Sequence, residues 1–416
     1  MRPLKIALLA RSYWEESQLH GNEEGGSTRQ LAEAVAALGH EVVVLSQSPE
    51  VRKLKTAQAG ALETWVSPRE KHRSLLTALR DRGAKRTYAH PKVYSDALSL
   101  REFLSRRGPF DVLWAQAESP DGLIAAILAR QGVKLPPLLV QVQALRSRLQ
   151  KGVAIFTEKA PLGLAFRQAA RILVNSEMTA AGLLRYAGPG LSADALQAKV
   201  HLVPPNILRA FLRAAQESGS SPAPMPDRVL YIGALTPVKG ALLFLRAAPK
   251  TEVSKRISTF VLLGDFPEYN KRLIRRWEEA QEAARVLLAG ARVEYLGHVS
   301  SFEVIRQMRL ARVVVLPSIY DGFARGVVEA LMLGRPVITT DQVGASPLVR
   351  AHQCGIVIPP GDSDALAHAI DAVLSPIVPF ADNARRAGQL LLHEFSPEAV
   401  ALQISRHLSE IALPPK

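Results

Sequence analysis

The sequence is poor in cysteine, in aromatic residues and in long apolar runs. One of its 416 residues is cysteine, Cys354, and aromatic residues make up 6%. A single cysteine excludes an intramolecular disulfide, and a small buried side chain is its simplest interpretation. No uncharged apolar stretch reaches the roughly 18 residues of a transmembrane helix. The amino-terminal apolar run is short and lacks a small-residue cleavage site, so we expect neither export nor membrane spanning, and a cytoplasmic location.

Several sequence motifs that indicate cofactor, metal or nucleic-acid binding are also absent. No Gly-x-Gly-x-x-Gly follows the first apolar segment, which argues against a nicotinamide-dependent dehydrogenase. No Asp or His cluster has the spacing of metal ligands, so we expect no metal and no other cofactor. A zinc pattern and an RNA-binding aromatic motif are absent, so no specific nucleic acid is expected. The pI of about 10 still leaves a basic nucleic-acid-binding protein as an alternative.

The positive charge of the chain is concentrated in its first half. The net charge is +14, and residues 52–107 hold 14 Lys and Arg against 5 Asp and Glu. A block of this kind has two interpretations, a solvated helical face or a surface that meets something anionic. An anionic membrane surface is one such partner, which would make the protein peripheral on the inner face of the membrane.

Two domains of ordinary size are expected from the length and from one composition break. Residues 216–227 are crowded with Gly, Ser and Pro and read as a linker. Short apolar runs alternate with helical patterns on both sides of it. We therefore predict two doubly wound α/β domains with parallel sheets, over 1–215 and 228–395, and a last helix over 396–416.

Ligands of open α/β sheets bind beyond the carboxyl ends of the strands, and two glycine-containing loops fall there. Gly25 and Gly26 precede a helix whose first N–H groups would suit a phosphate, although a plain turn would use the same residues. Gly233 opens a second loop that leaves a strand and places Lys239 just before a helix. A lysine at a helix start is unfavourable without an anion, although a solvated surface lysine remains the alternative.

The third loop is the most informative, because it carries two carboxylates. Asp321 precedes a helix, where a carboxylate also serves as a simple cap. Glu329 follows eight residues later, inside an otherwise apolar helix. A carboxylate there needs a partner, so we interpret Glu329 as functional rather than structural.

This third segment resembles the retaining glycosyltransferases of family four, which share the GT-B fold. Their motif is Pro-Ser, an acidic residue, seven further residues, Glu-Ala and then Gly-x-Pro-Val. The matching residues are Pro317-Ser318, Asp321, Glu329-Ala330 and Gly334-Arg-Pro-Val337.

The resemblance extends over nearly the whole chain in order. Gly25-Gly26 and Gly39-His40 look like the family's first signature, and Val203-Pro-Pro-Asn206 is similar to the stretch before its linker. Gly233 to Gly240 looks like its phosphate-binding loop. The resemblance implies two facing Rossmann-like domains, with the last helix crossing back to the first domain.

The resemblance also implies roles for single positions. Lys239 and the amides of Gly25 and Gly26 would hold the diphosphate of the nucleotide-sugar donor, Asp321 would bond sugar hydroxyls, and Glu329 would bind the ribose. These three side chains, Asp321, Lys239 and Glu329, are the expected catalytic group. The other residues expected to bind the nucleotide sugar are Gly233, His298 and Val299 near the base, and Gly322, Phe323, Ala324 and Arg325 near sugar and phosphate.

The implied reaction transfers a sugar, with retention, from a UDP-, GDP- or ADP-sugar to a hydroxyl of a glycan or lipid-linked acceptor. Three positions depart from the family pattern. Asp321 replaces the usual Glu, Ala234 stands where the family has a phosphate-binding Arg, and Gln143 stands where it often has His. Arg325 is a candidate replacement for the missing Arg. These departures leave a catalytically impaired sugar-nucleotide-binding protein as an alternative.

Overall fold

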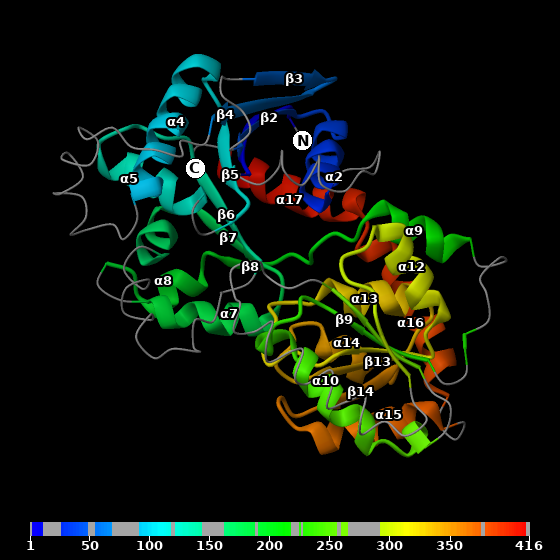
Figure 1. Ribbon diagram of the computed structural model, residues 1–416. Coiled ribbons are helices and arrows are strands. Elements are labelled where there is room, and N and C mark those ends of the chain that lie inside the picture. The colour runs from blue at the N-terminus through cyan, green and yellow to red at the C-terminus, as the bar shows by residue number, and fades with distance from the viewer. Residues whose placement is uncertain are drawn as a thin grey trace. The chain divides into compact units, whose positions relative to one another are not determined.

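The chain forms two compact units, and each is an α/β sandwich built on a parallel sheet (Figure 1). In this computed structural model the first unit comprises Met1–Asn206 with Pro397–Lys416, and the second comprises Ile207–Ser396. The structure describes residues 2–10, 26–48, 55–68, 91–117, 121–143, 162–187, 190–217, 224–225, 228–255, 259–264, 292–375 and 379–412.

The first unit contains an eight-stranded sheet in the order β3-β4-β2-β1-β5-β6-β7-β8. All neighbouring strands pair in parallel except the antiparallel pair β3 and β4 at one edge. The strands are β1 (Lys5–Leu9), β2 (Glu41–Ser48), β3 (Lys55–Ala59), β4 (Leu62–Pro68), β5 (Val112–Ala115), β6 (Leu138–Val142), β7 (Arg171–Val174) and β8 (Val200–Leu202).

Helices cover this sheet because successive strand residues bury opposite faces. Leu8 packs in one apolar cluster and Leu9 in the other, as continuous apolar strands require. The helices are α2 (Ser27–Ala37), α4 (Pro91–Arg107), α5 (Leu123–Arg130), α7 (Glu177–Leu183), α8 (Ala193–Gln197) and α17 (Pro397–Ala412), together with a helical stretch over 162–168 and the 3₁₀ turn η3 (Leu184–Tyr186).

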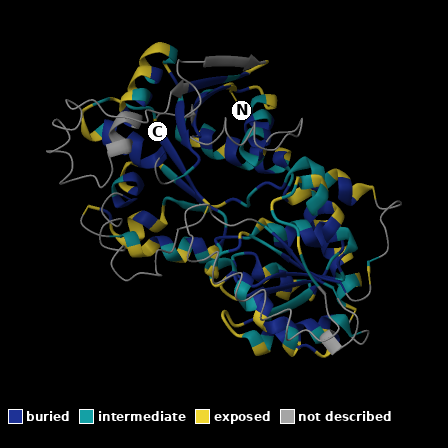
Figure 2. Cartoon of the chain, in the orientation of Figure 1, coloured by how far each residue is buried: buried dark blue, intermediate teal, exposed yellow. Residues whose placement is uncertain are grey.

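The second unit contains a six-stranded, fully parallel sheet in the order β11-β10-β9-β12-β13-β14. Tyr231 and Leu230 again enter opposite clusters, and Figure 2 shows the inner strands of this sheet mostly dark blue within their helical cover. The strands are β9 (Arg228–Ile232), β10 (Thr259–Leu263), β11 (Arg292–Tyr295), β12 (Val313–Leu316), β13 (Val337–Thr340) and β14 (Gly355–Ile358).

One face of the second sheet packs against α9, α12, α13 and α16, and the other against α10 and α15. The helices are α9 (Arg209–Gln216), α10 (Ala241–Ala247), α12 (Ser301–Leu310), α13 (Arg325–Met332), α14 (Ser346–Ala351), α15 (Ser363–Leu374) and α16 (Phe380–Glu394). The 3₁₀ turns are η4 (Pro237–Lys239), η5 (Ala248–Lys250) and η6 (Glu252–Lys255).

The units divide before the stretch that composition marks as a linker. The second unit starts at Ile207, whereas the composition break covers 216–227. The difference arises because α9 buries Phe211 in the core of the second unit. At the other end of the chain, α17 packs against α2 with Val400 and Ile404 buried in the first unit.

Some expected elements cannot be compared. Residues 69–90 of the basic region 52–107 lie outside the described residues. The helix α4 agrees with a helical face in this basic region, whereas the hairpin of β3 and β4 was not expected. In the described part of the chain, no helix combines the length and the apolar character needed to cross a membrane.

Candidate functional site

Three glycines line the carboxyl edge of the second sheet, one after each of three adjacent strands. Gly233 follows β9, Gly264 follows β10 and Gly297 follows β11. The Gly233 N–H donates to the Leu263 carbonyl over 3.1 Å, and the Gly264 N–H donates to the Gly297 carbonyl over 3.0 Å. A Cβ on Gly264 would lie 2.0 Å from the Gly233 oxygen, so this close backbone packing requires glycine there.

A buried tyrosine contacts both ends of the loop that follows β9. The Tyr231 hydroxyl lies 3.0 Å from the Ala234 carbonyl oxygen and 3.3 Å from that of Lys239, so it joins the two ends of the loop. Burial raises the pKa of the Tyr231 phenol well above its usual range, which keeps it a proton donor. Thr236 caps the 3₁₀ turn η4 and thereby fixes the direction in which Lys239 leaves the loop.

The central contact of the site is an ion pair between Lys239 and Asp321. The Lys239 Nζ reaches the Asp321 Oδ2, and the side chains are 35% and 16% exposed. These fractions place the pair at the edge of the protein interior, where charges are less screened than on an open surface. The structure therefore brings together two of the three residues expected to be catalytic.

The other oxygen of the Asp321 carboxylate holds the start of α13. Oδ1 accepts N–H bonds from Phe323 at 3.3 Å and Ala324 at 3.0 Å. This is the local turn that short acidic side chains make with backbone two and three residues ahead. A glutamate is one methylene too long for that turn, which gives a structural reason for aspartate here.

Two amides expected to face the sugar and phosphate are therefore already engaged. The N–H groups of Phe323 and Ala324 point to Asp321. Ala324 has φ of +62°, a left-handed conformation that costs a non-glycine residue about 1–2 kcal/mol. Gly322 is buried and Arg325 is exposed at the first position of the helix.

Glu329 lies on α13 one turn beyond Arg325. Burial raises the pKa of the Glu329 carboxyl, and the Arg325 guanidinium partly opposes that rise. No hydrogen bond joins the Glu329 carboxyl to any other residue in the part of the chain that the structure describes. Among the described residues, the Glu329 carboxyl therefore has the charge of Arg325 nearby but no hydrogen-bond donor.

The remaining residues expected near the base follow β11. His298 is exposed and Val299 is partly buried, and both lie directly after Gly297. The bond between Gly297 and Gly264 ties this segment to the loop after β10. His298 thus lies at the same carboxyl edge of the sheet as Gly233.

The glycine pair of the first unit can be described only in part. Gly25 lies outside the described residues, whereas Gly26 is buried at the start of α2. Gly26 has φ of −78°, extended backbone that any residue adopts, so its conformation does not require glycine. The buried Asn206 side chain donates to the Ser27 carbonyl over 3.0 Å and anchors this helix start.

A cluster of amide side chains lies at the carboxyl edge of the first sheet. Gln143 donates to the Gln116 Oε1 over 3.2 Å, and the Asn175 side chain donates to the Gln143 carbonyl. Gln116 is 6% exposed, and its Nε2 has no partner among the described residues. Sequence reasoning singled out Gln143 but missed Gln116 and Asn175, which only the strand order brings to it.

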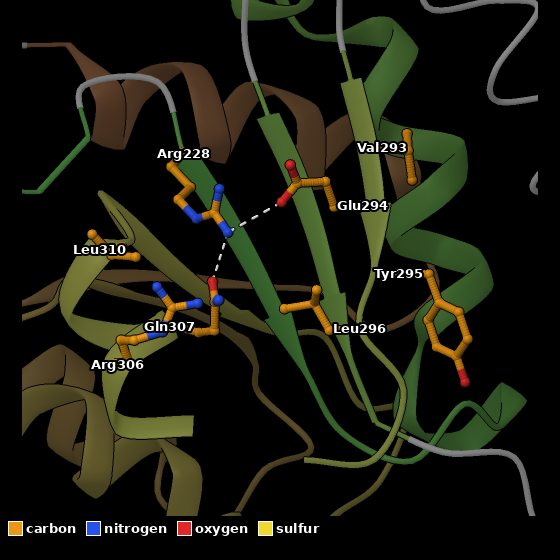
Figure 3. A pocket seen from close by; sticks show the side chains of 8 residues that line it. All are labelled: Arg228, Val293, Glu294, Tyr295, Leu296, Arg306, Gln307 and Leu310. Carbon is orange, nitrogen blue, oxygen red and sulfur yellow. Dashed lines mark hydrogen bonds and ion pairs between the residues drawn. The ribbon is translucent and has the colours of Figure 1, made fainter. Parts of the chain in front are cut away.

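A hollow of about 520 Å³ lies beside the edge strand β11, and none of the residues expected in the site lines it (Figure 3). The guanidinium of Arg228 bonds the Glu294 carboxylate at 3.2 Å and the Gln307 Oε1 at 2.6 Å. The residues that line the hollow are Arg228, Val293, Glu294, Tyr295, Leu296, Arg306, Gln307 and Leu310.

Within the described ranges, no group of three or more His, Cys, Asp or Glu side chains could hold a metal ion.

Two family models match the chain, one on each half. Residues 25–205 match the model described as glycosyl transferase 4-like domain, and residues 226–376 match the model described as glycosyl transferases group 1. Together the two models cover most of the chain.

Curated relatives include proteins aligned over nearly their whole length. The chain is 25% identical to the MMP alpha-(1->4)-mannosyltransferase of Mycolicibacterium hassiacum, over 96% of each chain. It is 24% identical to the glycogen synthase of Mycobacterium tuberculosis, over 93% of this chain and 91% of that protein.

Solved structures share the fold. Sucrose-phosphate synthase from Thermosynechococcus elongatus superposes with a TM-score of 0.72 at 22% identity, over 99% of each chain. The Anabaena HepE protein in complex with UDP and glucose superposes with a TM-score of 0.67 at 18% identity, over 98% of this chain and 99% of that chain.

Gly240 tests how tightly the loop of Lys239 is packed. It has φ of +79°, and an added Cβ would lie 2.2 Å from the Pro317 carbonyl oxygen. We expect Gly240→Ala to lower the free energy of unfolding by about 3 kcal/mol, from backbone strain and overpacking together. Gly361 has φ of +82° and open space around it, so Gly361→Ala is the control for strain alone. Equal losses in urea unfolding would contradict the packing.

Glu329 gives a pH-dependent prediction. Because its pKa is raised above the ordinary 4.5, the folded state holds the proton more tightly than the unfolded state. Stability therefore falls as pH rises above that value, and each pKa unit is worth about 1.4 kcal/mol. We expect Glu329→Gln to melt at a higher temperature than the wild type near pH 8, with a gap that closes as pH falls to about 4.5.

The control for Glu329→Gln is Glu394→Gln, which removes an exposed carboxylate from α16. This control separates loss of one negative charge from relief of burial. A melting-temperature gap for Glu329→Gln that is independent of pH, or matched by the control, would show that the ionised Glu329 carboxylate does not destabilise the fold.

Proposed function

Because the chain belongs to the retaining glycosyltransferases of family four, with the GT-B fold, we propose that its second unit binds the nucleotide-sugar donor at the carboxyl edge of its sheet. The transferred sugar goes to a hydroxyl acceptor. The observation that carries the placement is the Lys239–Asp321 ion pair, which puts a cation beside a helix start and next to a glycine-lined edge.

Lys239 would neutralise the leaving diphosphate. Transfer breaks the bond between the anomeric carbon and a phosphate oxygen, so positive charge develops on the sugar and negative charge on the diphosphate. A fixed ammonium stabilises that negative charge most strongly where water is limited. Arg325, exposed at the first turn of α13, would add the charge that Ala234 does not supply.

Asp321 would exchange partners when the nucleotide sugar binds. In the structure its Oδ2 contacts Lys239 while Oδ1 stays on the helix amides. A diphosphate at Lys239 would compete for the ammonium and leave Oδ2 able to accept a sugar hydroxyl. The turn to α13 would keep the carboxylate in place throughout.

Glu329 would take the ribose hydroxyls. A half-buried carboxyl that makes no hydrogen bond to a described residue suits a ligand that donates two hydroxyl groups. His298 and Val299 would meet the base. Because HepE is a complex with UDP and glucose, a UDP-sugar is the first of the UDP-, GDP- and ADP-sugars to test.

The acceptor would meet the first unit. The neutral amides of Gln116, Gln143 and Asn175 offer hydrogen bonds to hydroxyl groups, and the buried Gln116 Nε2 lacks a partner among described residues. A glycan or lipid-linked sugar of the cell envelope fits this chemistry. Region 52–107 would hold the protein on an anionic membrane, and loss of vesicle co-sedimentation after replacing the Arg and Lys residues of 80–86 tests that role.

The test is a thermal-shift panel of UDP-, GDP- and ADP-sugars on the full chain. One nucleotide class should stabilise the wild type, and Lys239→Met should weaken that binding about tenfold or more, since a charge-assisted contact is worth about 1.5–3 kcal/mol. Lys250→Met is the charge-matched control, because Lys250 pairs with Asp364 on the surface. Equal binding by both variants would contradict the placement.

Two further experiments test whether a metal is needed and whether Arg325 contributes to transfer. Stabilisation by the nucleotide sugar should survive EDTA, since Lys239 would supply the positive charge that a metal ion would otherwise provide. Arg325→Ala should slow turnover in a coupled assay for released nucleotide. Unchanged turnover would remove Arg325 from the diphosphate site.

A further inference from the structure

Arginines line the amino-terminal edge of the second sheet, at the opposite ends of the strands from the proposed nucleotide-sugar site. Arg228 begins β9, Arg312 immediately precedes β12, and Arg335 lies two residues before β13. These three strands are neighbours, in the order β9-β12-β13, and all run parallel. The Arg312 N–H donates to the Arg228 carbonyl over 2.8 Å, which holds the first two starts together.

Two helices add further arginines to this edge. Arg309 is in the last turn of α12, and its side chain is 16% exposed. Arg385 of α16 lies against the turn before Arg335, because a Cβ on Gly334 would be 2.7 Å from the Arg385 Cγ. Four arginines, Arg309, Arg312, Arg335 and Arg385, thus come to this edge from two strand starts and two helices.

The nearby carboxylates do not balance these charges. Glu217 lies 3.8 Å from Arg309, and Asp382 pairs with Arg385 on the exposed rim. Arg312 and Arg335 have no carboxylate partner among the described residues. Among the described residues, these four guanidinium groups and two carboxylates leave two positive charges in excess.

Helix ends offset part of this excess. Arg309 donates to the Ala214 carbonyl of α9 at 2.6 Å, and Arg335 donates to the Leu333 carbonyl at the end of α13 at 3.1 Å. Carbonyls at helix ends favour cations. The offset is incomplete, since burial and then the charges of Arg385, Arg312 and Arg309 lower the pKa of Arg335 to about 10.

The cluster also has unused hydrogen-bonding capacity. The Arg309 Nε is buried and has no partner in the described structure. The Arg312 side chain makes no hydrogen bond or ion pair in the same part of the chain. The ordinary partner for several converging guanidinium groups is an oxyanion with more than one acceptor oxygen.

We propose that Arg309, Arg312 and Arg335, with Arg385 at the rim, bind a phosphate-bearing anion at the amino-terminal edge of the second sheet. A phosphate dianion matches the two excess charges and offers oxygens to more than one guanidinium group. The site is distinct from the nucleotide-sugar site, because it lies at the other ends of the same strands. The phosphate belongs either to a soluble compound or to a phospholipid headgroup.

Pyrophosphate is the soluble probe, titrated calorimetrically at constant ionic strength. All proteins carry Lys239→Ala, which removes the cation of the proposed nucleotide-sugar site. Any change in pyrophosphate binding between variants therefore cannot come from the nucleotide-sugar site. We expect Arg312→Gln/Arg335→Gln to bind pyrophosphate at least about tenfold more weakly than the Lys239→Ala parent.

The matched control is Arg246→Gln/Arg350→Gln, which removes the same charge from two exposed helical positions. It should bind pyrophosphate as the parent does. In chloride buffer, Arg312→Gln/Arg335→Gln should melt no lower than the Lys239→Ala parent, since it relieves repulsion, and such a melting temperature shows that the variant is folded.

Co-sedimentation with vesicles of phosphatidylglycerol, compared with vesicles of neutral phosphatidylcholine, distinguishes a phospholipid headgroup from a soluble phosphate compound. Weaker co-sedimentation of the arginine variant, without a pyrophosphate effect, identifies the lipid headgroup. Weaker pyrophosphate binding alone identifies a soluble phosphate. If the arginine variant and the control behave alike in both assays, the proposed site does not exist.

Discussion

The ion pair between Lys239 and Asp321 is the contact on which the organisation of the second unit's carboxyl edge depends. The two residues are 82 positions apart in sequence, yet their loops leave the neighbouring strands β9 and β12. A backbone hydrogen bond also joins the two loops, because the Ile319 N–H donates to the Val238 carbonyl over 2.7 Å. Gly240 lets the first loop approach Pro317 closely enough for the charges to meet.

Asp321 links this charge pair to the helix that carries Glu329. One oxygen faces the ammonium of Lys239, and the other holds the N–H groups before α13. Movement of the loop after β12 would therefore disturb the Lys239 cation, the start of α13 and the half-buried Glu329 carboxyl together. A site that must bind a diphosphate and a ribose at once gains from this rigidity, since a misplacement of about 1 Å costs catalysis heavily.

The sequence predicts the architecture well, because continuous apolar strands alternating with helices have few other solutions. The spacing of Asp321 and Glu329 and the glycine-lysine loop also point to the second unit. The pairing of Lys239 with Asp321 was beyond prediction, because it depends on which strands are neighbours. The same holds for Gly264, whose signal is only a glycine after an apolar run, and for Tyr231, which reads as an ordinary core residue.

Local sequence also hides features that depend on tertiary packing. α9 belongs to the second unit because Phe211 fills its core, although a later segment has the composition of a linker. Gln116 and Asn175 join Gln143 only through the strand order of the first sheet. The hairpin of β3 and β4 carries too few apolar residues in alternation to stand out from the basic region around it.

The most direct measurement is a double-mutant cycle of Lys239→Met and Asp321→Asn on affinity for the nucleotide sugar. Because the two side chains form one unit, each single variant should bind weakly and the double variant no more weakly than the worse single one. The coupling should lie within about 0.5–3 kcal/mol. Losses that simply add would show that Lys239 and Asp321 act independently, and would contradict a nucleotide-sugar site built on their ion pair.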